Sequence, residues 1–282
     1  MTSIEMSGLL TQTGPGTPLG ELLRRYWQPF FVASELTDAR PIRPTRILSE
    51  TLVLFRDKGG RMGLIQERCP HGGYQLIFGS IDGNSLACAR HGWHFDIDGN
   101  CWVVGYQDKI YPMGWAHGKT YPVRQYAGLL WTYLGPEPAP DLPRLDVLAR
   151  DDGRRRITVY PNTAANVFED PGFDADSLLL PTHRRHGALW LRMPMDDSHT
   201  WQVAVEFARA TDGAAADPFT EAPEIMRADA LPPTGTEADK SEARIARLQE
   251  LFLAEIDRVS AGADPTGVTR DAGHPMIETG LI

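Results

Sequence analysis

Two short cysteine and histidine pairs constrain the fold of this chain more than any other feature. The first pair, Cys69 and His71, encloses one residue, and the second pair, Cys88 and His91, encloses two. The sixteen residues between the pairs include glycines and an asparagine, so the chain can turn back and bring the two loops together. Two thiolates and two imidazoles that meet in this way indicate a metal site.

The spacing inside the pairs distinguishes between two kinds of metal site. A structural zinc site usually has two or more residues within each pair, whereas Cys69 and His71 enclose only one. The pattern resembles the Rieske 2Fe-2S motif, in which two thiolates hold one iron and two imidazoles hold the other. This resemblance implies that Cys69 and Cys88 bind one iron, and that His71 and His91 bind the second. The alternatives are a zinc knuckle or four unrelated buried residues.

The resemblance extends beyond the two loops. From Leu10 to about Asp146 the chain is similar to the N-terminal half of a large (alpha) subunit of a Rieske non-haem iron aromatic-ring oxygenase, of the phthalate-oxygenase type. This implies a reductase or ferredoxin as electron donor and a trimer-type ring of subunits. The segments that carry the similarity are Thr13–Pro18, Leu22–Trp27, the two cluster loops, Phe95–Gly99 and Trp131–Pro136.

Residues beside the two loops are expected to tune the cluster. Glycines follow each pair, so backbone N–H groups can approach the sulfurs and hydrogen-bond to them. Trp93 and Phe95 are expected to shield the site from water. The family usually has Pro-Tyr where Ala89 and Arg90 stand, and the charge of Arg90 beside His91 is expected to favour the reduced cluster.

The order of strands and helices predicts an α+β protein. We expect an N-terminal helical segment over residues 1–40, an antiparallel β Rieske domain over 41–140 and a shortened helix-grip domain over 141–282, which is a sheet with a long C-terminal helix. The proline-rich run Pro136–Pro143 is stiff and cannot join a central strand, so the second boundary is placed there.

Two helices have recognisable starting signals. Thr17 precedes a helix expected from Pro18 to about Trp27, and Thr236 precedes a long helix expected to reach about Ala261. This helix is expected to face a sheet or a partner with an apolar stripe, formed by Ile245, Leu248, Phe252, Ile256 and Val259. Strands are expected over residues 47–55, 62–66, 85–89, 93–97, 103–106, 121–124, 128–134, 156–160, 188–193 and 199–207.

The second metal site of the family has no clear counterpart in this sequence. Family members hold a mononuclear iron with the pattern Asp-x2-His-x4-His and a later carboxylate. Starting that pattern at Asp174 places Ser177 and Thr182 where the histidines belong. The resemblance therefore leaves a mononuclear Fe(II) without ligands in this chain, and the catalytic residues unknown.

Other residues are considered for the roles that this pattern would have filled. His183, His186 and His199 are the alternative mononuclear iron ligands. Arginines lie between the first two and disfavour a bound cation, so the favoured interpretation is a solvated loop with surface histidines. Asp196 and Asp197 fit a polar turn between strands better than a metal site. The candidates for a carboxylate that bridges the cluster to the next iron are Glu169, Asp170 and Asp174.

Together these observations predict a Rieske subunit of an oxygenase system. It would relay electrons from a reductase to the mononuclear iron of a full-length partner subunit in a hetero-oligomer, for oxidation of a small aromatic or cyclic compound. A complete mono- or dioxygenase with a rearranged iron site is one alternative, and a non-catalytic structural or regulatory subunit is another.

Charge and cysteine content bear on the partners of the protein and on its location in the cell. The net charge of −9 argues against nucleic acid or an anionic membrane surface as a partner. Of the three cysteines two are assigned to the cluster, which leaves Cys101 over and no disulfide framework. No apolar run approaches the ~20 residues that span a bilayer, and no targeting signal is recognised, so a cytoplasmic location is expected.

Overall fold

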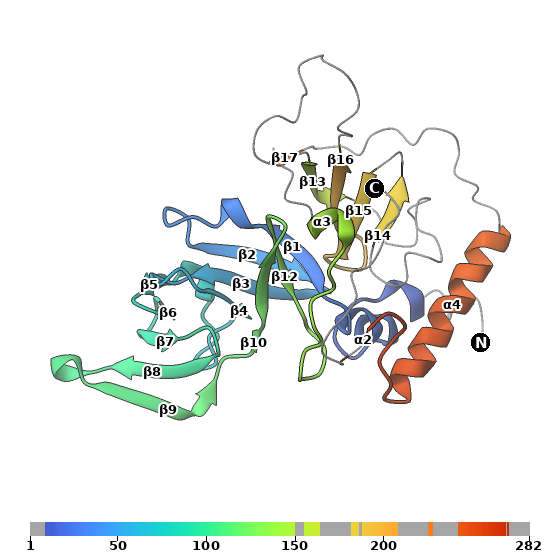
Figure 1. Cartoon of the computed structure of the whole chain (residues 1–282). Coiled ribbons are helices and arrows are strands. Elements are labelled where there is room, and N and C mark those ends of the chain that lie inside the picture. Colours follow the sequence, from blue (N-terminus) through green and yellow to red (C-terminus); the bar gives the residue numbers. More distant parts are fainter. Residues whose placement is uncertain are drawn as a thin grey trace, which may run out of the picture. The chain divides into compact units, whose positions relative to one another are not determined.

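The computed structural model divides the chain into two compact units (Figure 1). One unit is Phe30–Leu134, and the other combines Met1–Pro29 with Gly135–Ile282. The sequence-based boundaries at 40 and 140 stay a prediction. The structure describes residues 9–149, 155–163, 182–185, 188–207, 225–227, 242–268 and 270.

The unit Phe30–Leu134 is built from short strands in three sheets (Figure 1). The first sheet has the order β1-β12-β11, the second β10-β4-β3-β2 and the third β5-β6-β7-β8-β9. The strands are β1 (Gln28–Val32), β2 (Ile42–Ile47), β3 (Glu50–Arg56), β4 (Met62–Gln66), β5 (Ser80–Asp82), β6 (Ser85–Ala87), β7 (Trp93–Phe95), β8 (Asn100–Val104), β9 (Ile110–His117), β10 (Thr120–Tyr121), β11 (Val123–Tyr126) and β12 (Leu129–Thr132).

The observed strands differ from the expected ones at several positions. The expected strand 47–55 contains a turn at Leu48 and Ser49, both of which have positive φ angles, of 46° and 63°. Strand β9, which contains Pro112 and Gly114, was not among the expected strands. It forms an edge of its sheet, where a residue without an N–H can be accommodated.

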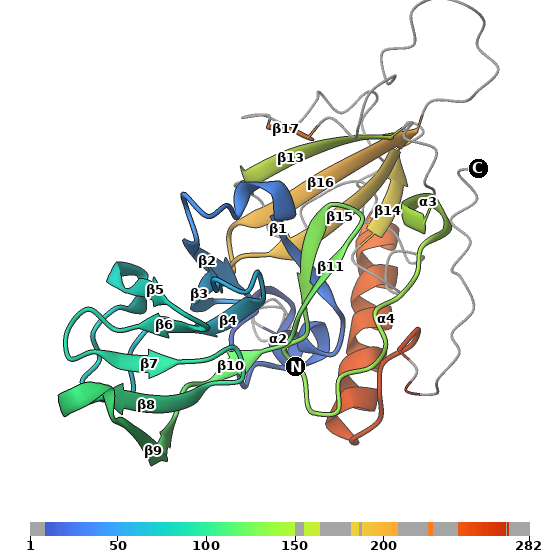
Figure 2. The same cartoon turned by 60° about the vertical axis from the view of Figure 1, so that its left-hand side comes forward.

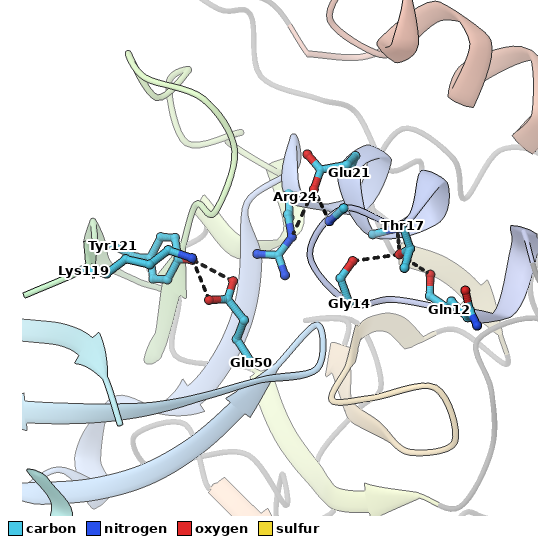
Figure 3. Close-up of polar contacts among 10 residues, drawn as sticks. Gln12, Gly14, Thr17, Glu21, Arg24, Glu50, Lys119 and Tyr121 are labelled. Atoms are coloured by element: carbon cyan, nitrogen blue, oxygen red, sulfur yellow. Dashed lines mark hydrogen bonds and ion pairs between the residues drawn. The ribbon is translucent and has the colours of Figure 1, made fainter. Parts of the chain in front are cut away.

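An ion pair and a hydrogen bond join the start of β3 to β10 (Figure 3). Glu50 accepts hydrogen bonds from the Lys119 Nζ at 2.8 Å and from the Tyr121 hydroxyl at 2.7 Å. Burial and the neighbouring carboxylate both raise the pKa of Tyr121. The backbone N–H of Lys119 also donates to the Gln66 side chain at 2.9 Å, so the segment that follows β9 is tied to β4.

The second unit contains a five-stranded sheet (Figure 2). Its order is β14-β15-β16-β13-β17, in which β13 and β17 are parallel and the other pairs are antiparallel. Its elements are α2 (Pro18–Arg24), α3 (Asp146–Ala149), β13 (Arg155–Thr163), β14 (Thr182–Arg185), β15 (Ala188–Pro194), β16 (Thr200–Phe207), β17 (Ile225–Arg227) and α4 (Glu242–Ser260). The α+β fold class predicted from the sequence is confirmed.

Helix α2 begins where the sequence predicts and ends earlier. The Thr17 side chain accepts a hydrogen bond from the Gly20 N–H at 3.2 Å, and its hydroxyl donates to the Gly14 carbonyl at 2.7 Å (Figure 3). The helix ends at Arg24 instead of Trp27. The Trp27 indole N–H donates to the Pro140 carbonyl at 2.9 Å and fixes the chain after the helix.

Helix α4 is joined to α2 by packing and by polar contacts of the segment that follows it. The two helices contact each other, and Phe252, Ile256 and Val259 of the predicted apolar stripe are buried. The buried Tyr26 hydroxyl donates to the Thr266 carbonyl at 2.9 Å, and Asp264 accepts from Arg25 and Arg270. The expected start of the helix at Thr236 lies outside the described residues. Among the described residues, no helix is long and apolar enough to cross a membrane.

Candidate metal centre

The two ligand loops adopt the same backbone turn although their sequences differ. In the first loop the Cys69 N–H donates to the Tyr74 carbonyl at 2.9 Å, and the Gly73 N–H donates to the Cys69 carbonyl at 2.8 Å. In the second loop Cys88 N–H donates to the Trp93 carbonyl at 2.8 Å, and a glycine four residues after Cys88 donates to the Cys88 carbonyl at 2.9 Å. The histidine stands at the third position of the first turn and at the fourth position of the second.

A glycine is required at the same place in both turns. Gly73 and Gly92 have φ angles of 71° and 64°, in the left-handed region that side chains with a Cβ rarely adopt. An added Cβ would meet no heavy atom within 4 Å at either glycine. Backbone conformation, and not lack of space, therefore selects glycine at these two positions.

The four candidate ligands are arranged as two inner thiols and two outer rings. Cys69 and Cys88 are each only 3% exposed, whereas His71 and His91 are exposed. The two imidazole rings lie 4.7 Å apart between centroids, with an interplanar angle of 68°. Sulfur ligands inside and imidazole ligands at the surface are the arrangement in which a 2Fe-2S cluster would present its histidine-bound iron outward.

The neighbours of the thiols also suit a pair of sulfur ligands. Burial raises the pKa of the Cys69 thiol, and the Cys88 sulfur beside it raises that pKa further. The backbone N–H groups of His71 and Gly72 approach the same sulfur and lower its pKa. These N–H groups are the expected donors to a cluster sulfur.

The four candidate donors match the ligand set of a Rieske cluster. Among the described residues, no three His, Cys, Asp or Glu side chains converge on one position that could hold a metal ion. A Rieske cluster does not need such a group, because each iron takes two protein ligands and two bridging sulfides. The assignment of Cys69, His71, Cys88 and His91 as these ligands stays a prediction.

Aromatic rings enclose one of the imidazoles. The Trp93 indole lies parallel to the His71 ring, with centroids 4.3 Å apart and an interplanar angle of 4°. Trp93 is 6% exposed and Phe95 is fully buried, which agrees with the expected shielding of the site from water. Because the stacked indole holds the ring plane of His71, it also restricts the direction in which that imidazole can face.

A polar pair beside the site was not predicted from the sequence. The Ser85 hydroxyl lies 3.0 Å from His94 Nδ1, and the His94 ring stacks on Trp102 with centroids 5.5 Å apart. Ser85 and His94 lie on adjacent strands β6 and β7, nine positions apart in the sequence. No local spacing rule indicates a contact of this kind.

Cys101 packs in the same core as the two thiols. It is 6% exposed and belongs to the apolar cluster that contains Cys69 and Cys88. Burial, together with the nearby Cys69 sulfur, raises the pKa of Cys101 to about 11. The thiol is therefore held protonated at neutral pH, which suits a packing role.

The histidines considered for a mononuclear iron occupy different places in the sheet. His199 lies in the turn between β15 and β16, where Asp196 accepts from its N–H at 2.9 Å and lies 3.0 Å from its Nδ1. His183 lies on β14 opposite Trp190, and Thr200 lies opposite Pro194. Trp190 and Pro194 are four residue steps apart on β15, which corresponds to about 13 Å of strand.

The remaining candidates of the second site cannot be compared in the same way. The described residues include neither His186 nor Glu169, Asp170 and Asp174. Asp197 accepts hydrogen bonds from the Thr13 N–H at 2.8 Å and from the Thr13 hydroxyl at 3.1 Å, so it anchors the segment before α2. A mononuclear site in this chain stays an alternative hypothesis.

Comparison with known proteins finds similarity in the N-terminal part of the chain. Residues 26–124 match the Rieske 2Fe-2S domain family. The chain is 41% identical over 163 residues to the 5,5'-dehydrodivanillate O-demethylase oxygenase subunit of Sphingobium sp. (strain NBRC 103272 / SYK-6), covering 56% of this chain and 38% of the relative. It is 44% identical over 171 residues to the phenoxybenzoate dioxygenase subunit alpha of Ectopseudomonas oleovorans, covering 57% and 40%. The chain thus spans about two fifths of the length of these relatives.

Solved structures share the fold over a longer stretch. NdmA of Pseudomonas putida CBB5 with caffeine has a TM-score of 0.59 at 17% identity, covering 90% of this chain and 98% of that chain. Dicamba monooxygenase with non-heme iron and dicamba has a TM-score of 0.58 at 14% identity, covering 86% and 99%. At these identities the likeness concerns the fold alone. The resemblance to Rieske oxygenase large subunits and the Rieske-type cluster, both predicted from the sequence, are confirmed.

Proposed function

We propose that this chain, which carries a Rieske 2Fe-2S domain and resembles the large subunits of Rieske oxygenases, is an electron-relaying subunit of an oxygenase system. It receives electrons from a reductase or ferredoxin and delivers them to the mononuclear iron of a partner subunit. That partner oxidises a small aromatic or cyclic compound. The observation that carries the proposal is the pairing of two buried thiols with two exposed imidazoles in matched turns.

The proposal assigns a role to each candidate ligand. Cys69 and Cys88 hold the inner iron, and His71 and His91 hold the outer iron. When bound, the cluster supplies reversible one-electron storage. The buried sulfurs keep water away from the inner side, and the exposed imidazoles form the side from which a partner can be reached.

The C-terminal unit supports a carrier more than a complete oxygenase. The sequence lacks the Asp-x2-His-x4-His pattern, and the one alternative histidine with a described side chain, His199, already contacts Asp196 within a strand turn. In this proposal Glu169, Asp170 and Asp174 are the candidates for the carboxylate beside the next iron. That iron belongs to a full-length subunit in a hetero-oligomeric, trimer-type ring.

A complete oxygenase is the second candidate function. One observation favours it: the likeness to dicamba monooxygenase with non-heme iron covers 86% of this chain, so it extends beyond the Rieske domain. In this alternative His183, His186 and His199 bind an iron in a rearranged pocket. It requires one more iron in each chain than the carrier does.

The test is the content of iron and acid-labile sulfide in anaerobically purified protein, with electron paramagnetic resonance of the reduced state. The carrier is expected to contain two irons and two sulfides per chain and to be reducible without oxidising any substrate. Three irons, or turnover of an aromatic acid by the chain alone, would contradict it. The matched control is Cys88→Ser, which is expected to lose both the sulfide and the reduced-state signal.

A further inference from the structure

A series of aromatic rings leads from one candidate ligand to the protein surface. The His71 ring stacks on Trp93 with centroids 4.3 Å apart, and Trp93 contacts Trp115 with centroids 5.3 Å apart at an angle of 75°. Trp93 is 6% exposed, whereas Trp115 is 74% exposed. Trp115 is thus the outer end of a continuous ring contact that begins at His71.

Trp115 belongs to the hairpin of β8 and β9, which carries most of the large exposed apolar side chains. Seven such side chains occur in the described part of the chain, and two of these, Tyr74 and Phe78, lie outside the hairpin. Exposed apolar groups gathered on one element mark interaction sites. The other five form what we call the hairpin patch: Val104, Tyr106, Ile110, Tyr111 and Trp115.

The strand register places part of this patch on the same face as the cluster shield. Trp93 pairs with Val103, and Val103 pairs with Tyr111, so these three residues form one row across β7, β8 and β9. In the same sheet β9 is the edge strand (Figure 2). A partner seated on the hairpin would therefore approach the row that ends beside His71.

The charge around the two loops and the hairpin differs in sign from that of the whole chain. Arg68, Arg90 and Lys109 are exposed there, against Glu67 and Asp108, while the chain carries a net charge of −9. Glu67 is half-buried, accepts from the Gln75 side chain at 2.8 Å and lies 3.8 Å from the Arg68 Nε, so it balances part of the charge of Arg68. Together with Arg90 and Lys109 against Asp108, this leaves a small positive excess in the region, which favours an acidic partner.

We propose that the hairpin patch is the docking surface for a small acidic one-electron carrier of the ferredoxin type, with Trp115 as the contact residue. The inference rests on the proposed function, since it names the surface used by the electron donor. The reduced carrier loses one electron and the oxidised cluster gains it, with no bond formed or broken and no proton moved. The exposed imidazoles remain free for the acceptor.

The experiment uses a purified acidic plant-type 2Fe-2S ferredoxin as the probe. Its dissociation constant is measured by calorimetry at low and high salt, for wild type, Trp115→Leu, Trp115→Phe and the control Phe78→Leu. Cluster reduction is followed by stopped flow with reduced ferredoxin and, separately, with dithionite, which needs no docking surface.

We expect Trp115→Leu to weaken ferredoxin binding by at least tenfold and to slow reduction by ferredoxin, because exposed tryptophans are often central to interfaces. Trp115→Phe is expected to keep most of the affinity, and high salt to weaken binding of wild type. Phe78→Leu should bind as wild type does. Reduction by dithionite and the reduced-state spectrum should be unchanged in all four proteins.

Three results would overturn the inference. The first is ferredoxin binding that Trp115→Leu leaves intact, and the second is a wild type that ferredoxin neither binds nor reduces. The third is a wild-type dimer or trimer that Trp115→Leu dissociates, which would make the patch a contact between copies of this chain. Any of these can occur in a protein with two irons and two sulfides, so this failure is separable from failure of the proposed function.

Discussion

Ser85 and His94 form a hydrogen bond in which the His94 ring is the donor. The Ser85 hydroxyl donates to the Asp82 carbonyl at 2.7 Å, and a carbonyl can only accept. The 3.0 Å contact between Ser85 Oγ and His94 Nδ1 therefore requires the hydrogen on Nδ1. Both residues are buried, so neither group can exchange this bond for one with water.

Removal of the Ser85 hydroxyl is expected to destabilise the Rieske unit. Ser85→Ala leaves the buried Nδ1–H of His94 without its acceptor, which costs about 1–3 kcal/mol in the free energy of unfolding. Ser85→Thr keeps the hydroxyl and is the matched control. Urea denaturation of the holoprotein measures the difference, and equal stability of Ser85→Ala and wild type would contradict the bond.

The charge of Arg90 is expected to set part of the cluster potential. Arg90→Gln removes a positive charge next to His91, which disfavours the more negative reduced cluster. The reduction potential should fall by an amount on the order of tens of millivolts. Spectroelectrochemical titration measures it, with the exposed Lys58→Gln as control. A potential that rises in Arg90→Gln would show that the sign is wrong.

Cys101 is expected to be dispensable for the cluster. Cys101→Ala should retain two irons and two sulfides per chain and lose only about 1–2 kcal/mol of stability, because a small buried side chain is shortened. Under the same preparation Cys88→Ala should contain neither iron nor sulfide. Loss of iron from Cys101→Ala would mean that the third thiol is a ligand.

The Asp264 carboxylate is expected to stabilise the contact between the two ends of its unit. The hydrogen bond from Arg270, and then Arg25, hold the pKa of Asp264 below its ordinary value. A lowered pKa in the folded state stabilises the fold above the unfolded value, near 3.8, and this contribution is lost as the pH falls through the folded pKa.

The corresponding variant is Asp264→Asn, which should lose about 1–2 kcal/mol at pH 7 through its weaker bonds to the arginines. The difference from wild type should shrink below about pH 4. Urea denaturation at pH 7 and pH 3.5 tests both statements. Asp257→Asn, an exposed position on α4, should show no such pH dependence.

The cluster loops could be anticipated from the sequence because their determinants are local. Each turn spans six residues, and its glycine and cysteine are visible as a spacing. The turn at Leu48 and Ser49 could not be anticipated, since neither residue favours a positive φ. Strand β9 was also missed; its Pro112 is accommodated because β9 is an edge strand, and edge position is a property of the fold.

Contacts between distant segments could not be predicted from the sequence, for a different reason. The ring contact of Trp93 with Trp115 depends on how β7, β8 and β9 align, and the bond from Tyr26 to Thr266 joins positions 240 residues apart. Periodicity indicates that one face of α4 is apolar, and Phe252 and Ile256 confirm it. It does not indicate that α2 is one of the elements packed against α4.

The bond between Tyr26 and Thr266 can form only late in the synthesis of the chain on the ribosome. The whole of Phe30–Leu134 is synthesised between these two residues, so it can collapse while α2 still lacks its partner. Roughly 130 further residues must follow, which takes about 7–26 s at ~5–20 residues per second. Throughout that interval α2, whose Leu19, Leu22 and Leu23 are buried in the folded protein, lacks its contact with α4.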